Sequence, residues 1–316
     1  MGGGGGAAPG AALAEGVVKP ADALLTLLAR GTLGGLGALP WARARAVGER
    51  LGDAVRALGV RRRVAEANLA LVFPGWSAAE RARVLREHYR ELGRVTAEYG
   101  HLDRLARAAA GEVIVDASGL ELLEPWRGRG VIVMSGHYSN FELLGACVGR
   151  INPVDFLVRP LSNPGAEALI SGIRARAGVG CISTALGTRG IYDALAAGRW
   201  VAILGDQDAR RRGCFVPFLG RPASTAAGPA RVALRTGAPI IMGFLERRSD
   251  GRFDLVVRGP LVPPEPEAPG AVERLTALHT AVLEERVRAR PELWFWLHRR
   301  WKTSPPAGGA TGGNGG

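Results

Sequence analysis

Residues 130–146 read GVIVMSGHYSNFELLGA, and this stretch decides the predicted fold. Its first part, VIVMS, is apolar throughout, as in a strand that is covered on both faces of a sheet. His137 follows that strand, a short polar turn comes next, and the sequence predicts a helix that begins near Asn140. Because open α/β sheets bind ligands at the carboxyl ends of their parallel strands, we expect His137 to lie at a ligand site.

Six other short β-rich runs lie on either side of this stretch. They are EVIVDA (112–117), VDFLV (154–158), GCIST (180–184), RWVAILG (199–205), APIIMGFLE (238–246) and FDLVVRG (253–259). Helix-like segments separate most of these runs, and a final amphipathic helix is predicted over residues 271–288. Strands that alternate with helices predict an α/β fold with a largely parallel central sheet flanked by helices.

The first 110 residues lack such runs and predict helices. Ser77 and Glu80 form a capping box, in which the serine caps a helix and the glutamate reaches back to it. The segment that follows has one apolar face, with Arg and Glu side chains expected opposite, formed by Val84, Leu85, Tyr89, Leu92 and Val95. We therefore expect disordered tails over 1–18 and 304–316, a helical region over 19–110, and an α/β domain over 111–303.

The stretch at residues 21–41, ADALLTLLARGTLGGLGALPW, is the most apolar of this helical region and is about as long as a bilayer is thick. Arg30, near its middle, would be costly inside a membrane. We expect an interfacial or shallowly inserted helix, with Trp41 at the level of the lipid headgroups. An ordinary buried helix is the alternative, and periodicity does not separate the two in so short a window.

The chain has 316 residues, a formal net charge of +12 and 47% hydrophobic residues, which excludes global disorder. A balance this basic indicates an anionic partner, which is nucleic acid, a membrane surface or a phosphorylated substrate. The positive charge is spread along the chain and no recognised nucleic-acid motif is present, so no nucleic acid is expected as a partner. The three cysteines lie at no metal-ligand spacing and indicate free thiols in a reducing compartment.

His137 and Glu142 are the candidate catalytic pair. Glu142 is expected in the first turn of the helix, close enough to turn its carboxylate toward the His137 imidazole. The carboxylate would then fix the tautomer of the imidazole and stabilise the imidazolium, while the histidine acts as general base. No Gly-x-Ser-x-Gly elbow is present, so the hydroxyl of the acceptor is the expected nucleophile in a direct acyl transfer. The alternative is a histidine that caps the strand end and a glutamate in solvent.

Charged residues after the run at 199–205 are candidate substrate-binding groups. Asp206 and Asp208 are expected to orient substrate hydroxyls, or else to cap the loop that follows. Two carboxylates with no third or fourth ligand argue against a metal site. Arg210 and Arg211 begin a run of three arginines that suits docking of a phosphorylated acceptor or an acidic carrier protein, although such runs are usually only solvated.

The ending WFWLHRRWK, at residues 294–302, mixes aromatic and cationic side chains. Such interleaving suits a membrane interface, and it also suits single-stranded nucleic acid. The third interpretation is a final strand or helix that faces the core and has a charged edge.

Four blocks of the chain stand in a distinctive order. They are NLALVFPGWSAAER (68–81), VRPLSNP (158–164), GDQDARRRGCFVPFLGRPASTAAGPARVALRTGAPII (205–241) and WFWLHRRWKTSP (294–305). Together with the His-x-x-x-x-Glu pattern of His137 and Glu142, these blocks resemble the lipid A late acyltransferase (lauroyl/myristoyl transferase) family of Gram-negative bacteria, within the lysophospholipid acyltransferase-like superfamily. The resemblance covers roughly residues 20–305.

The resemblance implies acyl transfer from acyl carrier protein, or from acyl-CoA, to a hydroxyl of a membrane glycolipid, a lipid A precursor in the first instance, or of a lysophospholipid. It implies work at the cytoplasmic face of the inner membrane without a metal or another cofactor, and it favours the membrane reading of the C-terminal ending. It also implies that His137 is the general base, that Glu142 is its partner, and that Arg159 contacts substrate. Arg221, in the third block, is a further substrate-binding candidate. A basic binding protein without catalysis and an acyl thioesterase are the alternatives.

Overall fold

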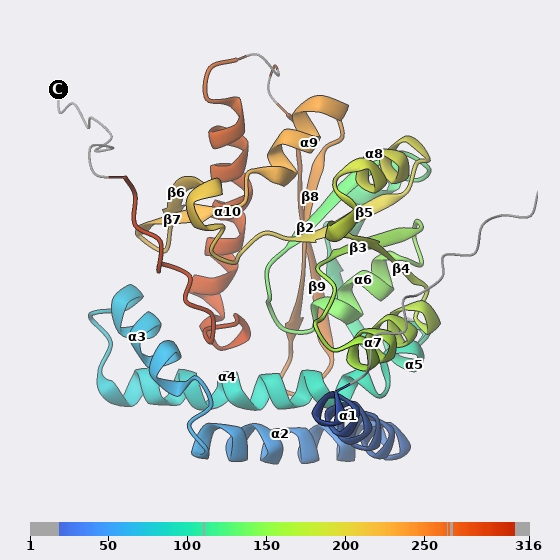
Figure 1. The fold of residues 1–316 in the computed structure, drawn as a ribbon, viewed down its shortest axis with the longest axis vertical. Helices are drawn as coiled ribbons and strands as arrows, with labels where there is room; N and C mark the ends of the chain where they lie inside the picture. The colour runs from blue at the N-terminus through green and yellow to red at the C-terminus, as the bar shows by residue number, and fades with distance from the viewer. Residues whose placement is uncertain (1–18, 110, 264, 266–267, 307–316) are drawn as a thin grey trace, which may run out of the picture.

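The computed structural model describes residues 19–109, 111–263, 265 and 268–306 (Figure 1). The expected tail at 1–18 and most of the one at 304–316 lie outside the described residues. The chain begins with five helices, which confirms the predicted helical N-terminal region. They are α1 (Pro20–Ala38), α2 (Trp41–Ala57), α3 (Arg62–Val72), α4 (Ala78–Tyr99) and α5 (Leu102–Ala106).

A seven-stranded sheet forms the centre of the molecule, in the order β1-β9-β8-β2-β5-β3-β4. Its strands are β1 (Ile114–Ser118), β2 (Val131–Ser135), β3 (Val154–Val158), β4 (Val179–Ser183), β5 (Trp200–Leu204), β8 (Ile240–Arg247) and β9 (Phe253–Leu261). Neighbouring strands run parallel, except that β8 and β9 are antiparallel. Each of the seven β-rich runs of the sequence became one of these strands, so the prediction of a largely parallel α/β sheet is confirmed.

Helices cover both faces of the sheet, which is why β2 is buried at every position. The side chains of Ile132 and Met134 pack on one face in a cluster with α9 (Gly228–Thr236) and α10 (Ala271–Ala289). Val131 and Val133 alternate to the other face, where the cluster includes α5 and α6 (Phe141–Val148). The remaining helical elements are α7 (Pro164–Arg176), α8 (Arg189–Ala196), η1 (Leu120–Trp126), η2 (Thr184–Leu186), η3 (Arg210–Arg212) and η4 (Pro291–Leu293).

A separate antiparallel hairpin, β6 (Cys214–Phe218) and β7 (Arg221–Thr225), was not predicted from the sequence. Pro217 and Pro222 stand opposite each other in this ladder, and proline weakens a strand signature because it has no amide hydrogen to donate. The hairpin is attached to α10, since the amide of Leu219 donates to Glu284 at 2.6 Å.

The N-terminal helices pack as a layer at one end of the sheet, with α2 lying along α4 (Figure 1). The predicted capping box of Ser77 and Glu80 is present at the start of α4. Helices α2 and α4 approach so closely that a Cβ on Gly93 would come within 1.9 Å of the Gly48 carbonyl oxygen. Glycine is therefore required at that crossing.

Helix α1 exposes most of its apolar side chains. Only Leu36 is buried, whereas its other leucines include four that are 57–66% exposed: Leu24, Leu25, Leu27 and Leu28. Within the described ranges, no helix combines the length and the apolar character that are needed to cross a bilayer. Trp41, which was expected at the level of the lipid headgroups, begins α2, is half-buried and donates its indole N–H to Glu98 at 3.4 Å.

Candidate active site

Two adjacent strands bring His137 and Asp206 together. Strands β2 and β5 pair in parallel from Val131 to Ser135, and each of the two polar residues stands second after the end of its strand. Nδ1 of His137 lies 2.7 Å from Oδ1 of Asp206. The backbone amide of His137 donates to Oδ2 of the same carboxylate at 2.8 Å. The aspartate therefore fixes both the ring and the main chain of the histidine.

The Asp206 carboxylate is buried and receives a third hydrogen bond. Its side chain is 2% exposed, and Nε1 of Trp294 donates to Oδ2 at 2.8 Å. Burial alone would raise the pKa of this carboxyl, but the His137 charge, the two His137 hydrogen bonds and the Trp294 hydrogen bond lower it to about 2. Asp206 is consequently ionised at neutral pH.

The second ring nitrogen of His137 faces the opening of the site. The side chain is 26% exposed, and its Nε2 lies 3.3 Å from Nε2 of Gln207, an exposed residue. Because a carboxylate binds Nδ1, the neutral ring carries its proton there and leaves Nε2 free to accept. Burial opposes the imidazolium, but the charge and hydrogen bond of Asp206 and the charge of Glu142 outweigh it and raise the pKa of His137 above 6.5.

The predicted contact between Glu142 and His137 is wrong. Glu142 does stand in the first turn of α6, but its carboxylate is buried and already bound. Arg174 of α7 forms a bidentate pair with it, at 2.9 and 2.5 Å, and the hydroxyl of Tyr99 donates to it at 2.8 Å. In the described chain, the carboxylate that binds the imidazole is that of Asp206.

Helix α4 holds the turn that follows His137. Oγ of Ser139 donates to Glu91 at 2.9 Å, and Nδ2 of Asn140 donates to Glu98 at 2.8 Å. Ser139 has a φ of 44°, a left-handed conformation that is uncommon for a residue with a Cβ. The other end of the Asn140 amide caps α6 by accepting from the amide of Leu143. These bonds fix the backbone that carries the imidazole.

Arg247, at the end of β8, pairs with two glutamates of α4, Glu91 and Glu98. It donates to Glu91 at 2.6 Å and to both carboxylate oxygens of Glu98, at 2.7 and 2.8 Å. All three side chains are at most 5% exposed. The expectation that the Glu side chains of this helix point to solvent is wrong for Glu91 and Glu98. They stand seven residues apart, on the same helix face as Val84, and that spacing was the signal available in the sequence.

Unlike Asp206, the other predicted binding residues form no hydrogen bond with His137 in the described part of the chain. Arg159 is exposed directly after β3, at the same edge of the sheet as His137. Arg210 and Arg211 are exposed in η3. Asp208 is held by the C-terminal segment, since its amide donates to His298 and its carboxylate accepts from Thr303, both at 3.0 Å. Arg221 is exposed in β7 and donates to the Leu71 carbonyl of α3 at 3.3 Å.

Part of the C-terminal ending belongs to the core, while Arg299 and Lys302 are exposed, which matches the predicted core-facing element with a charged edge. Trp294, Trp296 and Arg300 are all at most 1% exposed, so the membrane reading of this segment is wrong for these residues. Two backbone hydrogen bonds join the segment to the catalytic turn. Ser139 donates to the carbonyl of Leu293 at 2.7 Å, and the amide of Phe295 donates to the carbonyl of His137 at 2.9 Å. The ending therefore forms one wall of the site.

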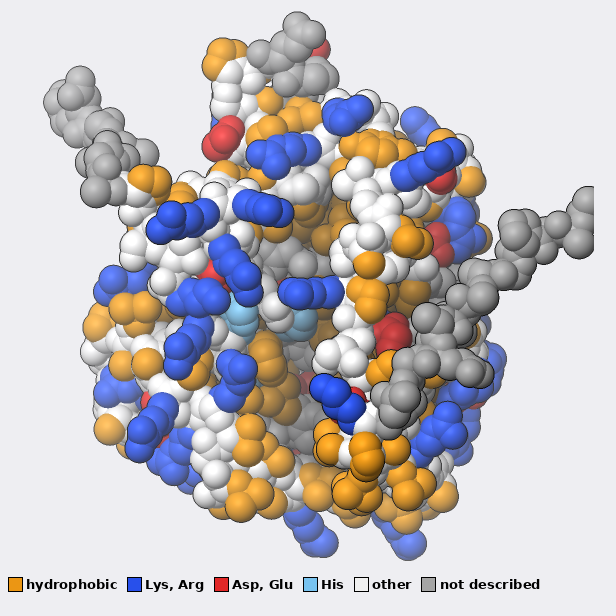
Figure 2. Space-filling view, in the orientation of Figure 1, with side chains coloured by type: hydrophobic (Ala, Val, Ile, Leu, Met, Phe, Trp, Pro, Cys, Tyr) orange, Lys and Arg blue, Asp and Glu red, His pale blue; other side chains and the backbone are white. Residues whose placement is uncertain are grey.

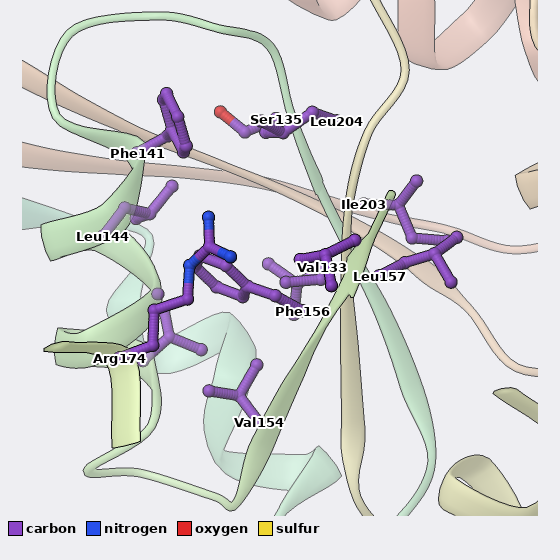
Figure 3. A pocket seen from close by; sticks show the side chains of 14 residues that line it. Val133, Ser135, Phe141, Leu144, Val154, Phe156, Leu157, Arg174, Ile203 and Leu204 are labelled. Atoms are coloured by element: carbon purple, nitrogen blue, oxygen red, sulfur yellow. The ribbon is translucent and has the colours of Figure 1, made fainter. Parts of the chain in front are cut away.

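An apolar cavity lies on the other side of the catalytic turn, between α6 and strands β2, β3 and β5 (Figure 3). Ser135 and Phe141 line it at one end, and the Phe141 ring also contacts the His137 ring, with centroids 5.4 Å apart. Arg174 and Phe156 line it farther in, with the guanidinium 5.4 Å from the centroid of the aromatic ring. A hydrocarbon chain that enters beside His137 would find apolar walls here.

The face around the site is positively charged. Figure 2 shows histidine surfaces in a central hollow, with Lys and Arg side chains along its rim and over the side where the hairpin and the C-terminal segment lie. Acidic side chains are sparse on this part of the surface. As for metals, the described residues contain no group of three or more His, Cys, Asp or Glu side chains arranged to hold an ion.

Comparison with known proteins identifies the family. Residues 18–303 match the model of the bacterial lipid A biosynthesis acyltransferases. This chain belongs to that family. It is 30% identical over 266 residues to a lipid A biosynthesis palmitoleoyltransferase of Escherichia coli (strain K12), covering 82% of this chain and 85% of the relative. A lipid A biosynthesis acyltransferase of Shigella flexneri matches to the same extent. The lipid A biosynthesis lauroyltransferase of Escherichia coli (strain K12) is 29% identical over 293 residues, which is 89% of this chain and 92% of the relative.

Membership of this lipid A acyltransferase family makes the chain an acyltransferase and confirms the resemblance seen in the sequence. Two residues of the site, Arg174 and Tyr99, were not singled out from the sequence, and both donate to Glu142. Trp294 was indicated only as the start of the aromatic and cationic ending, whereas in the structure it donates to Asp206.

Proposed function

We propose that this chain transfers a fatty acyl chain from a thioester of acyl carrier protein, or of coenzyme A, to a hydroxyl of a lipid A precursor. The names of its relatives support this acceptor class, because they refer to lipid A biosynthesis. The observation that carries the chemistry is the pair formed by His137 and Asp206, with 2.7 Å between Nδ1 and Oδ1. A histidine oriented by a buried carboxylate is the arrangement that activates a hydroxyl in acyl transfer.

The reaction starts with the acceptor hydroxyl hydrogen-bonded to Nε2 of His137. The histidine takes the hydroxyl proton as the oxygen attacks the carbonyl carbon of the thioester. Asp206 stabilises the imidazolium that forms, through the hydrogen bond at Nδ1. As the carbon–sulfur bond breaks, the imidazolium returns its proton to the leaving thiolate, so the enzyme ends the cycle unchanged.

The apolar cavity beside His137 is the proposed site of the acyl chain. It begins at Ser135 and Phe141, near the imidazole, and continues between Leu144, Val154 and Phe156 (Figure 3). Because these walls are hydrocarbon, burial of the chain supplies binding energy away from the reacting carbonyl.

Glu142 has a different proposed role from the one that the sequence suggested. Its carboxylate fixes the guanidinium of Arg174 at the wall of the acyl cavity, and its charge favours the imidazolium of His137 without a direct hydrogen bond. Asp206 takes the part of the partner carboxylate.

The exposed arginines at this edge of the sheet are proposed to bind the anionic groups of the acceptor or the donor. Arg159, Arg210 and Arg211 all lie there with free access to solvent. Guanidinium groups bind phosphate through paired hydrogen bonds, which gives orientation as well as charge attraction.

We also propose that the helical region over 19–110 attaches the enzyme to the inner membrane at its cytoplasmic face. The four exposed leucines of α1 support this, because an apolar helix surface that none of the described residues covers suits insertion among lipid headgroups. Arg30 then lies at the headgroup level, where its charge costs little.

Purified full-length protein tests the proposal when it is incubated with acyl carrier protein thioester and a lipid A precursor that lacks one acyl chain. Mass spectrometry is expected to show the precursor gain one acyl group, and the gain is expected to require His137. Release of free fatty acid that does not depend on the precursor would instead indicate a thioesterase. Salt-sensitive binding of DNA without transfer would indicate the basic binding protein.

A further inference from the structure

A second groove is lined by Tyr99 and shares no lining residue with the acyl cavity. Helix α1, the end of α4 and helix α7 enclose it, with a volume of about 400 Å³. Ligand pockets typically have volumes of roughly 300 to 1,000 Å³, so the groove is large enough for a small amphiphile. Neither His137 nor Asp206 lines it, and it is therefore distinct from the proposed acyl-transfer site.

Contacts at both ends of α1 keep this groove open between them. Near the N-terminal end, Oγ1 of Thr26 donates to Asn163 at 3.1 Å, and Asn163 donates to the carbonyl of Asp22 at 2.9 Å. Near the C-terminal end, Nε2 of His101 lies 3.0 Å from the carbonyl oxygen of Leu36. Between these contacts Leu33 and Gly34 line the groove, although the helix also packs on the end of α4, since a Cβ on Gly100 would come within 2.5 Å of the Leu33 carbonyl oxygen.

The walls of the groove combine hydrocarbon with two arginines. Leu33, Leu169 and Ile173 supply the apolar part, while Arg30 and Arg176 are both exposed. Among the described residues, neither guanidinium takes part in an ion pair within 4.0 Å. The one carboxylate in the lining, Asp103, is already paired with Arg107 at 2.8 Å. The groove is therefore apolar inside and positively charged at its rim.

Three glycines of α1 face open space, and one of them lines the groove. A Cβ on Gly31, Gly34 or Gly35 would meet no atom within 4 Å, so the packing of the chain does not require glycine there. Each glycine in a helix costs about 1 kcal/mol relative to alanine. Gly34 lines the groove, where a bare backbone leaves room for a ligand chain.

We propose that the groove binds one anionic phospholipid of the membrane on which α1 lies. The phosphate lies between Arg30 and Arg176, and an acyl chain lies along Leu33, Gly34 and Ile173. This inference rests on the proposed membrane attachment, and it gives Arg30 a partner within an otherwise apolar helix. Tyr99 lines the groove and donates to Glu142, so the bound lipid also stabilises the wall of the acyl cavity.

Calorimetric titration of the full-length protein with dihexanoyl phosphatidylglycerol, below its micelle concentration, tests the headgroup contact. Dihexanoyl phosphatidylcholine and inorganic phosphate, at matched ionic strength, are the comparison ligands. We expect the phosphatidylglycerol to bind at least about tenfold more tightly than either, because the choline ammonium offsets the phosphate charge in phosphatidylcholine and inorganic phosphate has no acyl chain to fill the groove. Equal binding of both phospholipids would overturn the proposal, and equal binding of inorganic phosphate would assign the arginines to a free anion.

A matched pair of double variants separates the groove from general electrostatics. Arg30→Gln with Arg176→Gln is expected to weaken phosphatidylglycerol binding about tenfold or more. Arg83→Gln with Arg189→Gln removes the same charge from exposed positions on α4 and α8 and is expected to leave binding unchanged. An equal loss in both pairs would show that only net charge matters and would overturn the site.

Two glycine variants test the apolar part without any change of charge. Gly34→Phe is expected to fill the groove and abolish binding, whereas Gly31→Phe, one turn earlier and outside the lining, is expected to keep it. Identical behaviour of the two variants would overturn the proposal. Flotation of the protein with phosphatidylcholine vesicles measures attachment separately. A protein that fails to float but binds the soluble phosphatidylglycerol contradicts the proposed attachment while supporting the groove.

Discussion

The carboxylate of Asp206 binds His137 twice, at the Nδ1 of the ring and at the backbone amide, over 2.7 and 2.8 Å. The two residues lie 69 positions apart in the chain, and the parallel pairing of β2 with β5 brings them together. A single carboxylate thus sets the orientation of the imidazole relative to the strand that carries it. Trp294 in turn orients this carboxylate.

Substitutions in the pair and in Glu142 separate the two candidate partners of the histidine. His137→Ala is expected to lower kcat by about a hundred- to ten-thousand-fold, the usual cost of losing a general base. Asp206→Asn is expected to lower it by a comparable factor, because the amide no longer favours the imidazolium or the correct tautomer. Glu142→Gln is expected to have a smaller effect. The rate of acyl transfer to the lipid acceptor is measured for all three variants, with circular dichroism as the control for folding. A larger loss in Glu142→Gln than in Asp206→Asn would show that Glu142 is the functional partner of His137.

The rate of acyl transfer is expected to rise with pH through a pKa above 6.5, because His137 accepts a proton only when it is neutral and Asp206 raises its pKa. In Asp206→Asn the rise is expected at lower pH, since the lost negative charge no longer favours the imidazolium. A pH profile of kcat/KM for both proteins measures the shift. An unchanged profile in the variant would show that another group titrates.

His137 and Asp206 also change the folding stability with pH, and their contributions change in opposite directions as the pH rises. The raised folded-state pKa of His137 stabilises the fold below pH 6.5, and this contribution is lost as the pH rises through the folded value. Asp206, whose pKa is about 2 in the fold against an ordinary 3.8, stabilises the fold above pH 3.8 and loses that contribution as the pH falls toward 2.

The sequence predicted the sheet better than it predicted the site, for a physical reason. Apolar runs such as VIVMS identify strands from local composition alone, and all seven central strands were found in this way. The partner of His137 depends on which strands are neighbours, and that order is set by packing over the whole domain. Local spacing selected Glu142, five residues away, but could not show that Arg174 and Tyr99 already bind its carboxylate.

Buried charges were the second feature that local reasoning missed. The Glu side chains of α4 were expected opposite its apolar face, but Glu91 and Glu98 are buried. They are buried because Arg247, about 150 residues later, supplies the opposite charge, and no local pattern indicates that pairing. Ser139 and Asn140 complete the network and connect it to the catalytic turn.

Arg247→Met is expected to lower the free energy of unfolding by about 3–5 kcal/mol, because Glu98 loses its paired cation and Glu91 keeps only the 3.4 Å contact with Arg94. Arg248→Met is the matched control on the next residue. Arg248 is 40% exposed and pairs with Asp254 at the surface, where such a pair contributes about 0–1 kcal/mol. Urea unfolding of both variants measures the difference. Equal stability of the two would show that the buried network does not hold α4 against β8.

Substitution of Gly145 in α6 tests whether the depth of the proposed acyl cavity sets the preferred acyl chain length. A Cβ at this position would come within 2.1 Å of Cε1 of Phe156, so Gly145→Ala is expected to push that ring into the cavity and shorten it. Gly172→Ala is the control, because its Cβ meets only the Arg176 side chain, at 3.6 Å. In competition between thioesters of graded chain length, Gly145→Ala is expected to shift kcat/KM toward shorter chains by about tenfold per excluded pair of methylenes, and Gly172→Ala is expected to keep the wild-type preference. A uniform loss for every chain length would mean that the acyl chain binds elsewhere.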